Sequence, residues 1–145
     1  MILYLDSSAL LKLYVDDKGS EQVRQLVARV RSACTHLIGY AGICAAFGRA
    51  QRMGRVSTED LPRLLQDFDS DWSNLEVVGV NETLVRRAGQ IAVHFGLSGY
   101  DSVHLAAAEA IARDIGQPSM LQFVAFDAAF DEAASALGFA CGSLG

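Results

Sequence analysis

The sequence opens with Ile2-Leu3-Tyr4-Leu5-Asp6-Ser7-Ser8, an apolar run that stops at a carboxylate and two hydroxyls. A short, β-prone apolar run is typical of a strand buried on both faces, as in parallel sheets covered by helices. Asp6 then falls at the carboxyl end of that strand, with a helix starting behind it at Ser8. Ligands of open α/β sheets bind at this edge, although Asp6 or Ser7 acting only as a helix cap explains the stretch equally well.

Composition limits the class of protein. The chain has 145 residues, and we expect one domain over residues 1–145 with a sizeable core. Apolar residues make up 51% of it, but no apolar run approaches the ~20 residues that cross a membrane. Because the start also lacks the basic segment of a secretory signal, we expect a cytoplasmic protein without membrane association. The net charge of -5 limits any nucleic-acid contact to a local patch.

Cysteine usage agrees with a reducing compartment. Cys34, Cys44 and Cys141 are odd in number and form no CxxC pair. We therefore expect three reduced, mostly buried thiols.

Strand and helix patterns alternate along the rest of the chain. Apolar, β-prone runs predict further strands at residues 34–38, 75–80, 121–126 and 139–141. Helical spacing predicts helices at residues 8–14, 19–31, 40–53, 61–68, 82–95, 98–115 and 128–137. Ser20, Ser57 and Asn81 are expected to cap three of these helices. The predicted fold is therefore α/β, a three-layer α/β/α sandwich with a mostly parallel central sheet.

Three carboxylates are expected to meet at one edge of this sheet. Asp6 and Asp127 each end a predicted strand, and Asp101 lies in the first turn of a helix that enters from the same side. Each also has a simpler explanation, since Asp101 forms an S-x-x-D box with Ser98 and Asp127 can cap the next helix. Clustered like charges repel one another and persist mainly where a cation neutralises them. The three together favour a metal site.

Three blocks around these acids resemble the signature blocks of PIN domains, specifically the VapC-type toxins of bacterial toxin–antitoxin pairs. The blocks are LDSSALLK at residues 5–12, YDSVHLAAA at residues 100–108 and FVAFD at residues 123–127. The resemblance covers the whole chain in order and spacing. It implies an endoribonuclease that binds Mg²⁺ or Mn²⁺ through four acids, a VapB-like antitoxin as partner, an RNA substrate and a homodimer. Asp6, Asp101 and Asp127 take three of the acidic positions.

Two positions depart from the pattern of this family. Gly42 stands where the family has a glutamate, and Ala125 stands where it usually has a hydroxyl residue. Glycine inside a helix costs roughly 1 kcal/mol relative to alanine, and the sequence indicates no packing reason for Gly42. Because the missing carboxylate would help to hold the ion or its water, we expect catalysis to be severely reduced. The alternative is a non-catalytic PIN domain that acts as an antitoxin- or RNA-binding module.

The expected roles follow from the chemistry of hard cations, which prefer oxygen ligands. Asp6 and Asp101 are expected to contact the metal, and Asp127 to hold a metal-bound water or a second ion. Ser7 or Ser8 would position substrate or an aspartate. His104, one turn after Asp101, is embedded in an apolar helix and is expected to be structural.

A basic cluster, Arg49, Arg52 and Arg55, lies near the end of one predicted helix. We expect it to contact RNA phosphate or an acidic antitoxin tail, against the alternative of ordinary solvated helix charge. Two other classes of phosphate-handling protein fit less well. A response receiver would need adjacent acids at the first strand, and a haloacid-dehalogenase-like phosphatase would need an Asp where Ser8 stands.

Overall fold

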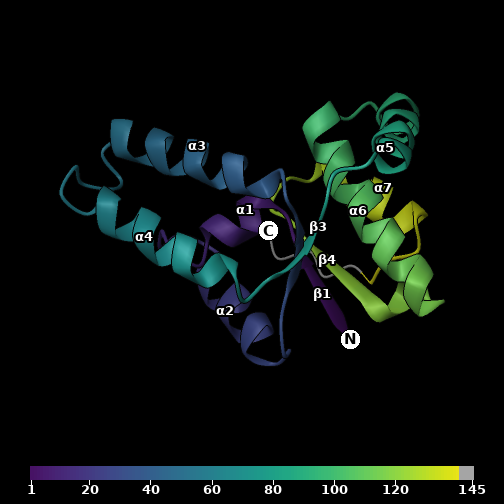
Figure 1. The fold of residues 1–145 in the computed structure, drawn as a ribbon, viewed down its shortest axis with the longest axis horizontal. Helices are drawn as coiled ribbons and strands as arrows, with labels where there is room; N and C mark the ends of the chain where they lie inside the picture. The colour runs from purple at the N-terminus through teal and green to yellow at the C-terminus, as the bar shows by residue number, and fades with distance from the viewer. Residues whose placement is uncertain (141–145) are drawn as a thin grey trace.

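The computed structural model describes residues 1–140, which form a parallel sheet between two layers of helices (Figure 1). The sheet has the order β3-β2-β1-β4, and its three strand pairings are all parallel. Ala140 adds one further parallel bridge, to Gln122. The strands are β1 (Ile2–Leu5), β2 (Cys34–His36), β3 (Glu76–Val78) and β4 (Leu121–Val124). The predicted three-layer α/β/α architecture is confirmed.

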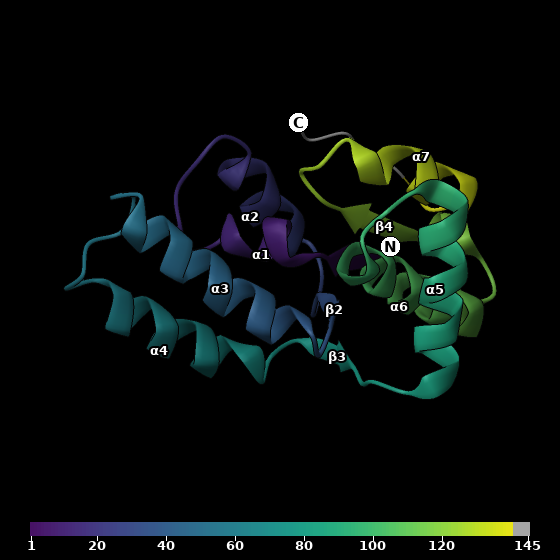
Figure 2. The ribbon, with the colours of Figure 1, turned by 90° about the horizontal axis from the view of Figure 1, so that it is seen from above.

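The helices divide between the two faces of the sheet, as Figures 1 and 2 show. One layer contains α1 (Ser7–Leu11), α2 (Ser20–Ala28), α3 (Gly39–Arg52) and α4 (Leu61–Trp72). The other contains α5 (Glu82–Phe95), α6 (Gly99–Ile115) and α7 (Ala129–Ala136), and a short 3₁₀ turn, η1 (Pro118–Met120), precedes β4.

Strand β1 is the centre of both cores. Leu3 and Leu5 pack with residues of α1 to α4, whereas Tyr4 packs with residues of α5 to α7. Successive side chains of a strand point to opposite faces, so one short strand supplies both layers. This is why the opening sequence is apolar at every position.

Two of the predicted helix caps are confirmed. Asn81 accepts a hydrogen bond from the Leu84 amide at 2.8 Å, and Ser98 accepts one from the Asp101 amide at 3.1 Å. Ser57 accepts from the Asp60 amide at 3.1 Å, but α4 begins only at Leu61 with Asp60 in the cap position, so the prediction that Ser57 caps this helix is wrong.

The prediction that Ser20 caps α2 is wrong. Gly19 takes the cap position with a φ of 94°, a left-handed conformation that favours glycine. Ser20 is thereby moved into the first turn, and its hydroxyl accepts instead from the Asp17 amide at 3.0 Å.

The strands are shorter than their apolar runs. β4 ends at Val124, so Asp127 lies in the following loop rather than at the strand end itself. β2 ends at His36 and β3 at Val78. Pairing, rather than hydrophobicity, decides where these strands end, because each backbone leaves the sheet once its neighbour has no residue opposite.

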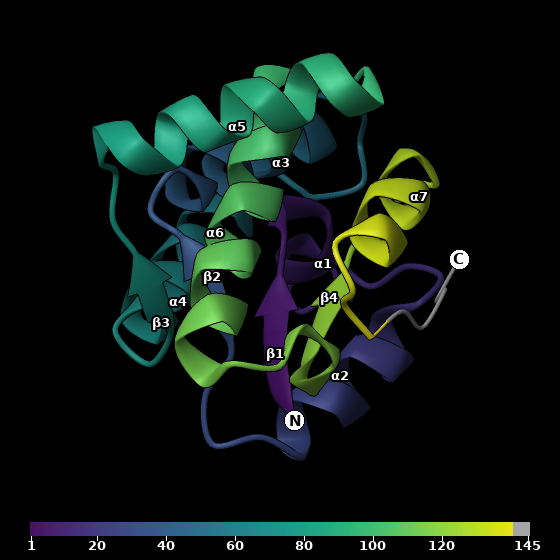
Figure 3. The same cartoon turned by 90° about the vertical axis from the view of Figure 1, so that its right-hand side faces the viewer.

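Helix α6 begins at the edge of the sheet where β1 ends and runs back along it (Figure 3). This arrangement places the first turn of α6, with Asp101, beside the carboxyl end of β1, with Asp6.

Two further predictions concern the whole chain. None of the helices within residues 1–140 is both long and apolar enough to span a membrane. Cys34 is buried and Cys44 is half-buried, both as free thiols. Cys141 lies outside the described residues, as does the end of the strand predicted at residues 139–141.

Candidate active site

The three predicted acids line one pocket of about 500 Å³ at the carboxyl edge of the sheet. Asp6 follows β1, Asp101 lies in the first turn of α6, and Asp127 follows β4. The convergence expected from the sequence is therefore confirmed. Other predicted site residues also line this pocket, namely Ser7, Ser8, Gly42, Arg49 and Arg55, whereas Arg52 does not.

Asp6 is the most buried of the three acids, with 4% of its surface exposed. Its Oδ1 accepts hydrogen bonds from Ser8 Oγ at 2.7 Å and from the Ala9 amide at 2.9 Å, so it caps α1 and also lines the pocket. Burial raises the pKa of Asp6 to about 6, the charge of Asp101 raises it as well, and the two hydrogen bonds oppose these effects. The capping and functional interpretations of Asp6 are thus compatible.

Asp101 and Asp127 continue the row of acids toward solvent. Burial raises the pKa of Asp101 above its ordinary value, the charge of Asp127 adds to this, and a hydrogen bond from Ser98 opposes it. Asp127 is exposed, and its Oδ1 accepts from the Ala129 amide at 3.0 Å. The charge of each acid therefore raises the pKa of the one buried behind it, and none of the three forms an ion pair with another residue among residues 1–140.

These carboxylates suit a divalent cation that uses one or two protein ligands, but not one that requires three. Among residues 1–140, no three His, Cys, Asp or Glu side chains lie close enough together to bind a single ion. Mg²⁺, however, keeps most of its waters and uses only one or two protein carboxylates. Asp6 and Asp101 suit that mode, because a cation would stabilise the charged form of Asp6, whose pKa is raised mainly by burial and further by the charge of Asp101.

The Ser8 hydroxyl makes two hydrogen bonds within this site. It donates to Asp6, and its oxygen also accepts from the Phe126 amide at 3.1 Å. Ser8 thus links the carboxyl ends of β1 and β4 through the most buried acid.

Gly42 has a packing partner that the sequence does not reveal. A Cβ at this position would stand 2.7 Å from Ser7 Oγ and 3.1 Å from Tyr100 Cζ, and it would overlap the Tyr100 hydroxyl oxygen. That hydroxyl donates a hydrogen bond to the Ile38 carbonyl at the start of α3. The expectation that packing does not favour glycine here is therefore wrong, because Tyr100 occupies the space of a side chain at residue 42.

Tyr100 is the site residue that sequence reasoning missed. It immediately precedes Asp101 and lines the same pocket. Its position next to an acid in the first turn of α6 is a weak signal, and only the approach of α6 to α3 makes it meaningful.

The three arginines have different surroundings. Arg55 pairs with Asp17 at 3.0 Å, and the same carboxylate accepts from Lys12 at 3.1 Å. Arg49 lines the pocket and makes no ion pair with any residue that the structure describes. Arg52 lies on the same helix but outside the pocket lining. Two of the three predicted cations therefore border the acids.

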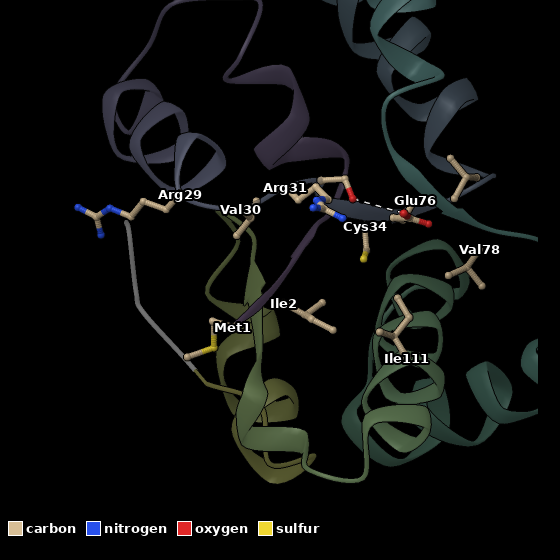
Figure 4. Close-up of a pocket in the computed structure, with 11 residues that line it drawn as sticks. Met1, Ile2, Arg29, Val30, Arg31, Cys34, Glu76, Val78 and Ile111 are labelled. Atoms are coloured by element: carbon tan, nitrogen blue, oxygen red, sulfur yellow. Dashed lines mark hydrogen bonds between the residues drawn. The ribbon is translucent and has the colours of Figure 1, made fainter.

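A larger cavity, of about 590 Å³, lies at the opposite edge of the sheet (Figure 4). Ile2, Cys34 and Ile111 contribute side chains to it, and among the residues that the structure describes Glu76 is its one carboxylate. Ligands of parallel sheets bind beyond the carboxyl ends of the strands. The acidic pocket is therefore the better candidate for chemistry.

The fold and the pocket together define a parallel α/β protein with carboxylates gathered at the carboxyl edge of its sheet. Comparison with protein families matches residues 3–136 to the family described as PIN domain. The chain therefore belongs to the PIN domain family, which confirms the resemblance seen in the sequence.

Several individual proteins are similar to this chain. Ribonuclease VapC45 and Ribonuclease VapC49, from two strains of Mycobacterium tuberculosis, are each 28% identical over 120 residues, 83% of this chain and 81% of theirs. Ribonuclease VapC3 of Pyrobaculum aerophilum is 26% identical over 111 residues, 77% of this chain and 84% of that protein. One chain of a toxin-antitoxin complex from Klebsiella pneumoniae shares the fold, with a TM-score of 0.61 and 15% identity over 88% of this chain and 87% of that one.

Proposed function

We propose that this chain is a Mg²⁺- or Mn²⁺-dependent endoribonuclease and the toxin of a toxin–antitoxin pair. The placement of Asp6 and Asp101 in one pocket at the carboxyl edge of the sheet carries the proposal. Membership of the PIN domain family and similarity to three proteins named ribonucleases support it. Such a protein would act in the cytoplasm, where its RNA substrate is found.

Asp6 and Asp101 would hold the ion, and Asp127 would hold one of its waters or a second ion. A divalent cation held there would supply a water of lowered pKa for attack on the phosphodiester and would stabilise charge on the leaving oxygen. Ser8 and the Ala9 amide keep the Asp6 carboxylate in one orientation. Asp6 must be ionised to bind a cation, so the ion has to overcome the raised pKa of this group.

Arg49 and Arg55 would bind the phosphates on either side of the scissile bond. Both line the pocket that contains the acids, and one guanidinium group can bind two phosphate oxygens at once. Arg49 is the stronger candidate, because Arg55 would have to exchange Asp17 for phosphate. Arg52, outside the pocket, would reach a more distant phosphate or an acidic segment of an antitoxin.

Two protein partners belong to this proposal. We propose a VapB-like antitoxin, supported by the shared fold of a toxin-antitoxin complex chain, and a homodimer, for which the resemblance to VapC-type toxins is the argument. The experiment for the antitoxin is co-purification with the product of a neighbouring reading frame.

A second candidate function is a non-catalytic PIN domain that binds RNA or antitoxin. Gly42 favours it, because the position lacks a carboxylate and the Tyr100 hydroxyl fills the space. Incubation of labelled RNA with the purified chain, in Mn²⁺ or in chelator, separates the two functions. Weak cleavage that stops in chelator supports the ribonuclease, and binding without any cleavage in either condition supports the binding module.

A further inference from the structure

A chain of polar side chains runs from the centre of the sheet to the floor of the acidic pocket. Tyr4 Oη lies 2.8 Å from His104 Nδ1, and His104 Nε2 lies 3.4 Å from Ser7 Oγ. The Tyr100 ring packs beside His104, with ring centroids 5.7 Å apart, and its hydroxyl donates to the Ile38 carbonyl. Tyr4 and His104 are fully buried, so protein groups rather than bulk water must satisfy them.

The protons along this chain have one consistent direction. The fully buried Tyr4 hydroxyl keeps its proton at neutral pH, as tyrosine ordinarily does, and needs an acceptor. The Thr35 hydroxyl donates its own proton to the Leu5 carbonyl at 2.8 Å, and His104 Nδ1, 2.8 Å from Tyr4 Oη, is the acceptor that we assign to the tyrosine. Burial lowers the pKa of His104 to about 4, and a neutral imidazole with a bare Nδ1 has its proton on Nε2. His104 then donates to Ser7.

The chain joins the segments that carry the acids. Ser7 directly follows Asp6, and His104 lies one turn after Asp101 on α6. We propose that His104 is a positioning residue, which uses this directed hydrogen-bond chain to hold the first turns of α1 and α6 at the spacing that the metal site requires. The effect on metal binding rests on the proposed function, whereas the hydrogen-bond chain does not depend on it. It also gives Ser7 a positioning role in place of direct contact with substrate.

The tautomer of His104 tests the direction of the hydrogen-bond chain. Long-range ¹H–¹⁵N NMR on histidine-labelled protein, without metal or RNA, should show His104 neutral at pH 7 with its proton on Nε2. His94, exposed on α5, is the solvent-facing reference in the same spectrum. Tyr4→Phe should move the Nδ1 resonance of His104 and leave the proton on Nε2. A proton on Nδ1, a charged ring at pH 7 or an unmoved Nδ1 resonance would overturn the proposal.

The positioning role is tested by Mn²⁺ affinity, measured by calorimetry on variants that a thermal melt shows to be folded. His104→Leu removes both links and should weaken Mn²⁺ binding about 5-fold, the effect of one lost hydrogen bond. His104→Gln retains a donor and an acceptor and should recover most of that affinity, and His94→Leu should change nothing. Folded His104→Leu protein with unchanged affinity would overturn the role.

A variant that fails to fold and a protein that binds no Mn²⁺ can each be distinguished from a failure of the positioning role. If His104→Leu does not fold, Ser7→Ala breaks the same chain from the pocket side and should weaken Mn²⁺ binding to a similar extent; full affinity in that variant counts against the proposal. If the unsubstituted protein binds no Mn²⁺, the proposed metal site fails, whereas the NMR spectrum still decides the direction of the hydrogen-bond chain.

Discussion

Gly42→Glu tests both the chemistry and the packing of the pocket. Its Cβ would overlap the Tyr100 hydroxyl oxygen and stand 3.1 Å from Tyr100 Cζ, so the Tyr100 ring has to move and release the Ile38 carbonyl. The lost hydrogen bond costs about 1 kcal/mol, and crowding costs about 1–3 kcal/mol. Replacing glycine within a helix returns roughly 1 kcal/mol. The free energy of unfolding of the metal-free protein should therefore fall by about 1–3 kcal/mol.

The same substitution should increase activity. A carboxylate added beside Asp6 and Asp101 should raise Mn²⁺-dependent RNA cleavage at least ~100-fold, the scale of a well-placed catalytic group, and make the gene toxic without its antitoxin. Gly42→Gln is the matched control, with the same bulk but no charge; it should lose as much stability and gain no activity.

Two results would refute this reasoning. If Gly42→Glu cleaves RNA no faster than Gly42→Glu combined with Asp6→Asn, the site has decayed beyond one residue and the binding module is the better account. If Gly42→Gln is as stable as the unsubstituted protein by urea unfolding, Tyr100 does not occupy the space of the missing side chain.

Three further predictions concern pH, RNA and association. Because the pKa of Asp6 is about 6 in the folded protein against 3.8 ordinarily, the folded state binds the proton more tightly. The metal-free protein should thus lose up to about 3 kcal/mol of stability as pH rises from about 4 to above about 6; urea unfolding that shows a gain, or the same slope in Asp6→Asn, would contradict this. Joint substitution of Arg49, Arg52 and Arg55 by Gln should weaken RNA or antitoxin binding and flatten its salt dependence, and unchanged binding of both rejects the role. Sedimentation at tens of micromolar should show a homodimer; a monomer with and without antitoxin would exclude it.

Much of the fold could be predicted from local sequence. The unbroken apolar run of β1 indicates burial on both faces, and Asn81 and Ser98 mark helix starts through short-range hydrogen bonds. The meeting of Asp6 with Asp127 also follows, because parallel strands place their carboxyl ends on one edge of a sheet, and the helix that carries Asp101 starts at the same edge.

What could not be predicted depends on tertiary contacts. Tyr100 and Ile38 are 62 residues apart. Only the packing of α6 against the start of α3 brings the Tyr100 hydroxyl into the space that a side chain at residue 42 would occupy. The failure at Ser20 has a local cause, since the left-handed backbone of Gly19 moves the helix start by one residue. Arg52 shares a helix and a charge with Arg49, but the rotation of α3 leaves it outside the pocket.

Calorimetric titration of the metal-free protein with Mn²⁺ tests the central claim, that the acidic pocket binds a divalent cation, most directly. The unsubstituted protein should bind Mn²⁺, and Asp6→Asn combined with Asp101→Asn should abolish that binding. Asp114→Asn, which removes an exposed acid on the same helix as Asp101 but outside the pocket, should bind as the unsubstituted protein does. Unchanged Mn²⁺ affinity in the double variant would contradict the account and place the ion elsewhere.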